Sequence, residues 1–394
     1  MTYKVLILHK WLIVGGVERI LLFYLSILEK LGYQIDLLIT YESENASWKE
    51  HNVKYIFRKD YLKNIDIIKD KKKKSIFQKI KYEFFKTREQ ILFKKFINNQ
   101  IKSNQYDLII DFSQVLDKYI RENGNLISKK NITTIRWIHN QIPSSSKRDI
   151  LKHNLIFSNH TAVIAICSEM KRIIKEQTQY KHNNIFVLYN PIDINLIKRK
   201  SEENINFQFS QEKYFLQVSR LVNGKGHIEL LEIYKTIRNK GITHKLYLIG
   251  DGENKTFLRN KIKELGLEND CVLLGEISNP YPFFKNATLF LHTSESEGLP
   301  TVLLESMVCG TPVVAMDCPT GPKEILGENS EYGKLIPMHN KEAFTEAVIE
   351  LLDDNEKYQY YCKKSIQRSL DFSSEKISEQ VQQLFTEIIK KHKS

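Results

Sequence analysis

Short apolar runs and longer amphipathic stretches alternate along nearly the whole chain. The runs are rich in β-branched and aromatic residues, as in buried strands, whereas the stretches between them place apolar residues at helical spacing. This alternation is typical of parallel sheets whose strands are connected by helices. The expected strands of the first half are residues 4–9, 34–40, 106–111, 133–137, 162–167 and 185–188, and those of the second half are 214–218, 245–249, 271–274, 289–292, 312–315 and 334–336.

Helices are expected between these strands. The first is closed by Gly32, because glycine readily adopts the left-handed conformation that ends helices. A break in the pattern at Pro191 and in the polar stretch 198–211 predicts two doubly wound domains. The expected helices include residues 17–31, 228–239, 255–265, 301–309 and 373–391, and the expected domains are residues 1–195 and 196–372, followed by a final helix within 373–394.

The composition is that of an ordinary folded protein, with 42% hydrophobic and 27% charged residues. A chain of 394 residues is longer than one hydrophobic core usually serves, in agreement with two domains. No apolar run reaches the roughly 18 residues that cross a bilayer, and residues 1–9 resemble a strand rather than a signal peptide. We therefore expect a cytoplasmic protein. The cysteines form no C-x-x-C pair and are expected to be buried free thiols: Cys167, Cys271, Cys309, Cys318 and Cys362.

The formal net charge of +12 indicates an anionic partner, for which nucleic acid, acidic phospholipid and a diphosphate substrate are all candidates. Part of the excess lies between Lys69 and Lys102, where the run Lys71 to Lys74 precedes further basic residues interleaved with aromatic ones. One interpretation is a solvated insertion whose aromatic side chains pack on the first domain. The other, which we favour, is a basic amphipathic surface on anionic lipid at the inner face of the cell membrane. Nucleic acid is disfavoured because no recognised binding motif accompanies the charge.

The most informative segment for function is residues 294–305, after the expected strand 289–292. A strand, a polar loop and a new helix leave unpaired backbone N–H groups at the carboxyl edge of a sheet, where anions and ligands bind. Glu297 precedes this helix and Glu305 lies within it. One carboxylate could therefore reach the reacting end of a ligand and the other a ribose diol. The alternative is that both are ordinary acidic residues beside and along a helix.

A second charged loop, residues 219–226, follows the first expected strand of the second domain. It carries Arg220 and Lys225 beside glycines, and two cations on such a loop suit a diphosphate. As isolated residues, they could equally be surface charges. The next strand ends in the tight turn Gly250-Asp251-Gly252, at the same edge of the sheet.

Taken in order, these segments resemble family 4 of the retaining glycosyltransferases, of the type that builds bacterial surface polysaccharides. The resemblance covers nearly all of residues 214–336. In the first half, residues 15–19 (Gly-Gly-Val-Glu-Arg) are similar to the family's glycine loop, and residues 137–140 (Trp-Ile-His-Asn) to its strand-end histidine. In the second half, six segments carry the resemblance. They are residues 219–221 with Lys225-Gly226, residues 250–252, Leu274-Gly275, Glu297 with Glu305, residues 309–315 (Cys-Gly-Thr-Pro-Val-Val-Ala) and residues 317–324.

The resemblance implies an α/β GT-B fold, with two Rossmann-like doubly wound domains facing each other across a cleft and the C-terminal helix crossing back to the first. It implies a metal-independent, retaining enzyme without a cofactor, which transfers a hexose from a UDP-sugar to a lipid-linked or surface-glycan acceptor. The residues implied for catalysis are His139, Glu297, Arg220 and Lys225, and those implied for donor binding are Gly16, Arg220, Lys225, Ile277, Gly298, Leu299, Pro300, Thr301 and Glu305.

The resemblance also implies a division of roles. Arg220 and Lys225 would neutralise the diphosphate, with the backbone near 298–301 assisting. Glu305 would bind the ribose, Glu297 the hydroxyls of the transferred sugar, and the backbone near Ile277 the base. Gly16 and His139 would lie across the cleft near the acceptor.

Some observations leave alternatives open. Asn223-Gly224 stands where many family members carry an acidic residue, and a lone histidine such as His139 after a strand is often structural. A UDP-sugar epimerase or hydrolase on a similar fold, or a non-enzymatic glycan-binding protein, would share many of these features. An NAD enzyme is disfavoured, because Gly15-Gly16 does not extend to G-x-G-x-x-G and Asp36 lies within its strand. The absence of an Asp-x-Asp triplet agrees with a metal-independent reaction.

Overall fold

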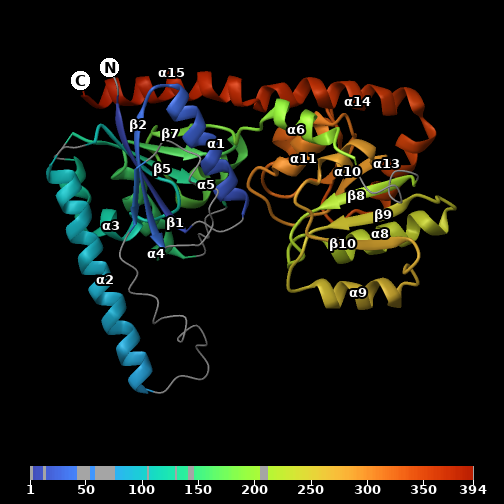
Figure 1. Cartoon of the computed structure of the whole chain (residues 1–394), viewed down its shortest axis with the longest axis horizontal. Coiled ribbons are helices and arrows are strands. Elements are labelled where there is room, and N and C mark those ends of the chain that lie inside the picture. The colour runs from blue at the N-terminus through green and yellow to red at the C-terminus, as the bar shows by residue number, and fades with distance from the viewer. Residues whose placement is uncertain are drawn as a thin grey trace. The chain divides into compact units, whose positions relative to one another are not determined.

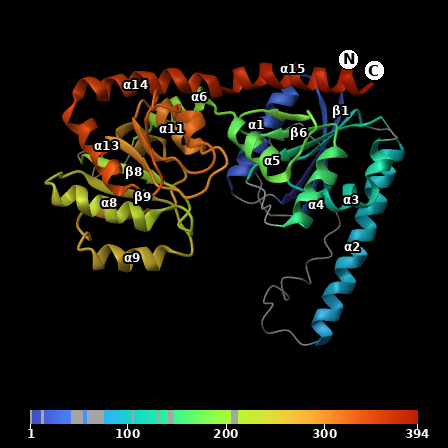
Figure 2. The same ribbon diagram turned by 180° about the vertical axis from the view of Figure 1, so that it is seen from behind.

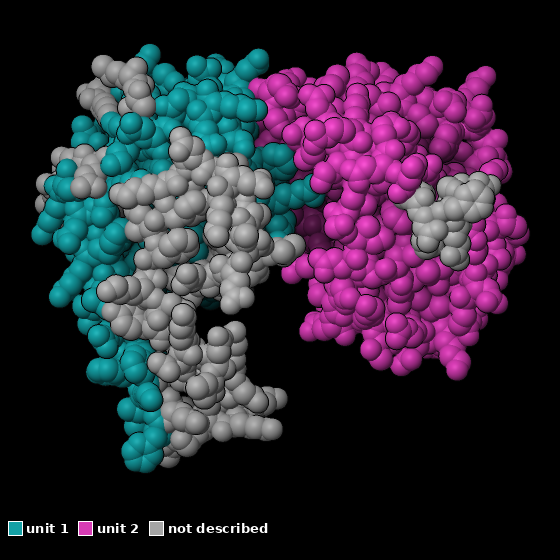
Figure 3. All heavy atoms as spheres, in the orientation of Figure 1, with its two compact units in different colours: residues 1–165, 171–188, 378–394 teal, residues 166–170, 189–377 magenta. Residues whose placement is uncertain are grey.

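The computed structural model describes residues 3–11, 15–41, 54–57, 76–103, 106–128, 131–140, 146–204 and 212–393. The chain divides into two compact units, each shown in its own colour in Figure 3. Unit 1 comprises residues 1–165, 171–188 and 378–394, and unit 2 comprises 166–170 and 189–377. The short segment 166–170, which the sequence pattern had placed in the first domain, is thus grouped with the second unit.

Unit 1 is built on a seven-stranded parallel sheet in the order β3-β2-β1-β4-β5-β6-β7. The chain moves outward from β1 in one direction and then from β4 in the other, so the order reverses between these two strands. The strands are β1 (Lys4–Trp11), β2 (Gln34–Tyr41), β3 (Lys54–Phe57), β4 (Leu108–Asp111), β5 (Thr133–Ile138), β6 (Ala162–Ala165) and β7 (Ile185–Val187). The helices are α1 (Gly16–Lys30), α2 (Ile76–Lys102), α3 (Asp117–Ser128), α4 (Lys147–Ser158) and α5 (Ser168–Thr178).

The first helix ends as its sequence predicts. Gly32 has a φ of +80°, and its N–H donates to the Glu29 carbonyl at 2.9 Å while the Tyr33 N–H donates to the Leu28 carbonyl at 3.0 Å. This backbone closure satisfies carbonyls that the end of a helix leaves unpaired. It places β2 directly beside β1, with Lys4 opposite Gln34.

The helix α2 has one part that packs on unit 1 and one part whose aromatic side chains are exposed. Its C-terminal part packs on the core of unit 1, where Ile97 is fully buried and Phe93 and Phe96 contact the same cluster. Nearer its start, Phe77 and Phe84 are 85% and 65% exposed, and Figure 1 shows the helix extending away from the rest of unit 1. Residues 69–75, with the run Lys71 to Lys74, lie outside the described residues.

Unit 2 is built on a six-stranded parallel sheet in the order β10-β9-β8-β11-β12-β13, with its own buried core. The order reverses between β8 and β11. The strands are β8 (Tyr214–Val218), β9 (Lys245–Ile249), β10 (Cys271–Gly275), β11 (Leu289–His292), β12 (Val313–Met316) and β13 (Lys334–Ile336). The helices are α6 (Ile194–Ser201), α8 (His227–Asn239), α9 (Lys255–Glu264), α10 (Tyr281–Asn286), α11 (Thr301–Val308), α12 (Pro322–Leu326), α13 (Lys341–Asp353) and α14 (Asn355–Ser369).

The helices of unit 2 form two groups. One contains α8, which contacts α9 and α13, and the other contains α11, which contacts α10, α12 and α14 (Figure 2). Two helical layers around one parallel sheet make a doubly wound fold, in which ligands bind beyond the carboxyl ends of the strands where the order reverses. Across both units, all twelve expected strands are present, and one further strand, β3, was not predicted.

The last helix is α15 (Ser374–Lys393). It begins beside residue 192, near the start of the long stretch 189–377 of unit 2. The Ile192 N–H donates to the Phe372 carbonyl at 2.9 Å, and the Ser374 N–H donates to the Ile192 carbonyl at 3.0 Å. From residue 378 onward the helix is grouped with unit 1. Among the described residues, no helix is both long and apolar enough to span a bilayer. The five cysteines are free thiols, three of them buried and two partly buried.

Candidate functional site

Two loops meet at the point where the strand order of unit 2 reverses. One is residues 219–226, which follow β8, and the other is residues 293–300, which follow β11. Because β8 and β11 are neighbouring parallel strands, both loops leave the sheet at the same carboxyl edge. The two loops that the sequence singled out for chemistry are therefore adjacent in the fold.

Hydrogen bonds fasten these loops to each other. The Gly224 carbonyl accepts from the Glu295 N–H at 2.9 Å and from the Ser294 hydroxyl at 3.0 Å, and the Gly226 carbonyl accepts from the Thr293 hydroxyl at 2.8 Å. Gly226 has a φ of +68°, and a Cβ there would lie 1.7 Å from the Thr293 carbonyl oxygen. Only glycine fits such an approach, so this residue lets the two loops pack together.

The loops bring Lys225 and Glu297 together. The Lys225 Nζ donates to Glu297 Oε1 at 2.7 Å, and His292 Nε2 lies 3.4 Å from the same oxygen. The side chains of Lys225 and Glu297 are only 19% and 13% exposed. The Lys225 backbone is itself held, because Gln217 Nε2 donates to its carbonyl at 3.1 Å. The pair is thus a partly buried ion pair on a well-supported loop.

Electrostatics fix the charge of Glu297. Burial alone would raise the pKa of this carboxyl, but the neighbouring His292 and Lys225 outweigh burial and lower the pKa to about 2. Next to the pair, burial together with the charge of Lys225 lowers the pKa of His227 to about 4, and its Nε2 lies 2.9 Å from the Ser219 hydroxyl oxygen. At neutral pH the site therefore holds an ammonium group, a carboxylate and an uncharged imidazole.

The loop before α11 is supported from the other side. The Thr320 hydroxyl donates to the Glu297 carbonyl, and a Cβ on Gly321 would lie 2.3 Å from Pro300 Cδ. Pro300 occupies the N-cap of α11 without a side-chain hydrogen bond to the helix. The first backbone N–H groups of α11 thus lack a side-chain cap, which is the arrangement that accepts an anion.

The other residues of unit 2 that were predicted to bind the donor lie along the same edge. Arg220 is exposed on the loop directly after β8, and Glu305 is 4% exposed within α11. Ile277 is half-buried after β10, two strands away from β8. The structure therefore places one cation, the carboxylate of Glu297 and the start of α11 side by side, with Ile277 farther along the edge.

A second group of predicted residues lies at the corresponding edge of unit 1. Gly15 and Gly16 follow β1 at the reversal between β1 and β4, and His139 follows β5 directly. The ring of His139 lies 4.4 Å from that of Phe112, which follows β4. Burial, with nearby His9 and Arg136, lowers the pKa of His139 to about 3. An uncharged imidazole can exchange hydrogen bonds with a hydroxyl group.

Sequence reasoning missed several members of these groups. His9, at the end of β1, lies 3.4 Å from Glu18, whose carboxylate folds back against Gly15. In unit 2, Glu324 accepts hydrogen bonds from the N–H groups of Ser168 and Glu169 at 3.1 and 3.3 Å. Glu18 lies within residues 15–19 and Glu324 within residues 317–324. Both segments carry the family resemblance, but the sequence pattern indicated no role for either glutamate.

Unit 1 also contains a cavity of about 380 Å³ beside these strand ends. It lies between α2, the end of β1 and the residues that follow β4, and its lining includes three lysines: Lys10, Lys94 and Lys118. Apolar side chains from α2, among them Ile91 and Phe93, line it as well. A cavity with both characters suits a ligand that is anionic and partly apolar.

Part of the chain is similar to a known protein family. Residues 198–368 match the model of the family described as "Glycosyl transferases group 1". This segment, which is less than half of the chain, is similar to members of that family. The predicted resemblance to a family 4 glycosyltransferase of bacterial surface-polysaccharide type is thereby confirmed.

Several curated proteins are similar to this chain. An N-acetylgalactosamine-N,N'-diacetylbacillosaminyl-diphospho-undecaprenol 4-alpha-N-acetylgalactosaminyltransferase of Campylobacter jejuni is 33% identical over 192 residues, which are 49% of this chain and 51% of the relative. A lipopolysaccharide 1,6-galactosyltransferase of Salmonella typhimurium is 26% identical over 294 residues, 73% of this chain and 77% of the relative. The chain spans about half the length of the first curated relatives it matches.

Solved structures of glycosyltransferases resemble the whole chain. The crystal structure of Anabaena Alr3699/HepE in complex with UDP has a TM-score of 0.76 with 19% identity and covers 98% of this chain and 100% of that one. The crystal structure of TarM has a TM-score of 0.72 with 16% identity and covers 98% and 99%. At this level of identity the likeness concerns the fold, and it confirms the predicted GT-B class with two Rossmann-like domains.

Proposed function

We propose that the chain is a retaining glycosyltransferase that transfers a hexose from a UDP-sugar to a lipid-linked or surface-glycan acceptor. The observation that carries this proposal is the Lys225–Glu297 pair, 2.7 Å apart, at the point where the strand order of unit 2 reverses. It combines a cation for a leaving diphosphate with an ionised carboxylate for sugar hydroxyls. The names of the relatives, which specify transfer of N-acetylgalactosamine and galactose, support the class of reaction.

The donor diphosphate would replace Glu297 as the partner of Lys225. The ammonium group would then neutralise charge that grows on the leaving phosphate, together with exposed Arg220 and the N–H groups that begin α11. No metal ion is required for this neutralisation, so we propose a metal-independent reaction. We assign Glu297 the role of orienting the sugar rather than of forming a covalent bond with it.

The acceptor would bind at the edge of unit 1 where β1 and β4 separate. His139, whose pKa lies at about 3, stays neutral there and can accept a hydrogen bond from the acceptor hydroxyl. The cavity lined by Lys10, Lys94 and Lys118 provides positive charge for a phosphate-bearing acceptor. The name of the Campylobacter jejuni relative includes a diphospho-undecaprenol, which supports an acceptor of this chemistry.

We further propose that α2 holds the protein at the inner face of a membrane. Its exposed apolar residues Phe77, Ile80, Phe84 and Ile91 are spaced by three, four and seven positions and therefore share one helical face. Exposed basic residues, including Lys81 and Arg88, lie beside them. Apolar side chains flanked by cations suit the boundary between acyl chains and anionic headgroups.

The direct test is to incubate the purified chain with UDP- and GDP-linked hexoses, with and without a bacterial membrane extract, and to measure nucleotide release. A glycosyltransferase should release UDP only when the extract supplies an acceptor, and the product should retain the anomeric configuration of the donor. Release of equal amounts without extract would instead support a hydrolase or epimerase, and release in neither case would support a glycan-binding protein.

A further inference from the structure

One wall of the cavity of about 380 Å³ in unit 1 is made by α2. Thr87, Ile91 and Lys94 line this wall, and their spacing of four and three positions places them on one face of the helix. The same spacing continues toward the start of α2, beyond the cavity, where the residues on this face are apolar. A single helical face therefore passes from a polar cavity to an apolar surface.

The apolar part of this face is exposed. Phe77, Ile80 and Phe84 are exposed, and Ile91, which is 52% exposed, also lines the cavity. These four residues form the apolar stripe of α2. At 1.5 Å per residue the stripe runs for about 21 Å along the helix. Because Ile91 belongs to both, the stripe is continuous with the cavity.

The cavity end of this face is positively charged. Three lysines and one glutamate line the cavity, which gives a net charge of +2: Lys10, Lys94, Lys118 and Glu122. Lys118 donates to Gln90 Oε1 of α2 and lies 3.9 Å from Glu122, whereas Lys94 is exposed to solvent. An excess of two ammonium groups suits a ligand with several anionic oxygens, as a diphosphate has.

Hydrogen bonds between protein groups fix the walls of the cavity. The Asp111 carboxylate accepts from the Val115 and Leu116 N–H groups at 2.8 and 3.0 Å, and this contact fixes the loop between β4 and α3. The Tyr119 hydroxyl donates to Asn98 Oδ1 at 2.6 Å and ties α3 to α2. Walls that are already in place lose little conformational freedom when a ligand binds.

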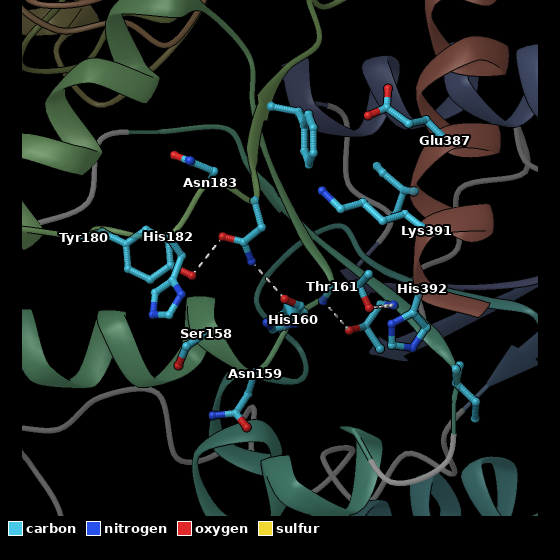
Figure 4. Close-up of a pocket in the computed structure, with 15 residues that line it drawn as sticks. Ser158, Asn159, His160, Thr161, Tyr180, His182, Asn183, Glu387, Lys391 and His392 are labelled. Atoms are coloured by element: carbon cyan, nitrogen blue, oxygen red, sulfur yellow. Dashed lines mark hydrogen bonds between the residues drawn. The ribbon is translucent and has the colours of Figure 1, made fainter. Parts of the chain in front are cut away.

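A second cavity of unit 1, of about 480 Å³, lacks this combination. Figure 4 shows Glu387 and Lys391 entering it from α15, so a negative and a positive side chain lie together in its lining. Its lining includes none of the strongly exposed apolar side chains of the described residues. A basic cavity that continues into an exposed apolar stripe thus distinguishes the cavity beside α2.

We propose that this face of α2 binds a single-chain lipid diphosphate, with the diphosphate in the basic cavity and the hydrocarbon chain along the apolar stripe. The proposal rests on the proposed function and specifies its acceptor as a glycan on such a lipid. Lys81 and Arg88 border the stripe on one side and Glu83 borders it on the other, so it is about one side chain wide and fits one chain. Contact with the stripe removes part of that chain from water.

The test is calorimetric titration of the full chain with farnesyl diphosphate, below its micelle concentration and with EDTA. Excess UDP is present, so that a diphosphate site in unit 2 is occupied. Inorganic diphosphate and farnesol probe the two ends of the ligand alone, and dihexanoyl phosphatidic acid probes a lipid phosphate with two chains. The wild type should bind farnesyl diphosphate at least about tenfold more tightly than each of the other three.

Variants at exposed positions separate the two ends of the site. Phe84→Ser should weaken binding of farnesyl diphosphate at least about fivefold and leave that of inorganic diphosphate unchanged, because only apolar contact is lost. Changing Lys94 and Lys118 together to Met should weaken binding of both diphosphates about tenfold. Leu151→Ser and Lys152→Met, both exposed on α4, are the matched controls and should bind farnesyl diphosphate as the wild type does.

Four results would each overturn the proposal: no binding of farnesyl diphosphate, equal binding of inorganic diphosphate, equal binding of the two-chain lipid, or binding that is unchanged in Phe84→Ser or in the double lysine variant. Melting curves show that the variants are folded. A failure of the proposed function is reported separately by titration of UDP itself, because the variants compared here change only side chains of unit 1.

Discussion

At the scale of single residues, the central feature of unit 2 is a lysine that is already paired. Lys225 and Glu297 lie 72 positions apart in sequence and form one partly buried ion pair. Breaking such a pair normally costs free energy, because one charge is left without a partner. A bound diphosphate would supply that partner for Lys225, and a bound sugar would supply hydroxyl donors for Glu297. Under the proposed function, the pair would hold the site in order until a donor replaces it.

The two carboxylates of this loop and helix should behave differently when each is changed. Glu305→Ala should weaken UDP binding, because we assign its side chain to the ribose. Glu297→Gln should bind UDP no more weakly than the wild type, since Lys225 is freed, but should lower turnover at saturating donor at least about tenfold. Titration calorimetry with UDP and initial rates with donor and acceptor separate the two effects. Equal loss of UDP binding in both variants, with normal turnover, would contradict these roles.

At the scale of elements, the helices and strands that could be predicted are those with a clear local pattern of apolar and polar residues. The strands were found because each is a short apolar run, and α1 because Gly32 closes it. β3 (Lys54–Phe57), an edge strand that pairs with β2, was not predicted. The pairing of Lys225 with Glu297, like the contact of Glu324 with residues 168 and 169, depends on tertiary structure and leaves no periodic signal in the sequence.

The contact between the loops after β8 and β11 depends on Gly226. Gly226→Ala adds a methyl group 1.7 Å from the Thr293 carbonyl, at a φ of +68°. We expect loss of UDP binding and several degrees of melting temperature. Gly241→Ala is the matched control, since its φ is +88° and no atom lies within 4 Å of the added Cβ. It should cost only the backbone strain of about 1 kcal/mol. Comparable losses in both variants would show that the loop contact is unimportant.

The helix α2 makes a prediction about membranes. In co-sedimentation with anionic vesicles at low salt, the wild-type chain should bind, and binding should fall at high salt because charges are then screened. Changing both Phe77 and Phe84 to Ser should reduce binding, and so should changing Lys71–Lys74 to Ser, each lysine contributing about 1 kcal/mol. Leu151→Ser, at a residue 70% exposed on α4, is the control and should bind normally. If binding is the same on neutral and anionic vesicles and is unchanged in both variants, α2 is a solvated helix that does not bind membranes.

At the scale of the whole molecule, buried histidines make the free energy of unfolding depend on pH. Burial lowers the pKa to about 3 for His139 and about 4 for His160 and His227, against 6.5 for the free side chain. Between pH 6.5 and these lower values the unfolded chain binds more protons than the folded chain. Stability is therefore full above about pH 6.5 and is lost as the pH falls toward 4.

This pH dependence can be measured by denaturant unfolding at pH 7.5 and pH 5. Each buried histidine should contribute about 2 kcal/mol of destabilisation over this range. His160→Gln removes one of these groups and should show a smaller loss between the two values than the wild type. A wild-type free energy of unfolding that is equal at both values, or an unaltered loss in the variant, would contradict the assignment of neutral buried histidines.

The proposed function of the whole molecule requires that the strand-order reversal of unit 2 is the nucleotide site. The most direct measurement is calorimetric titration of UDP into the chain in the presence of EDTA. The wild type should bind UDP without a metal ion, and Lys225→Ala should bind it more weakly by about 1.5–3 kcal/mol. Lys255→Ala, which removes a lysine paired with Asp251 on the surface, should bind normally. UDP binding that vanishes with EDTA, or that is unchanged in Lys225→Ala, would contradict the account.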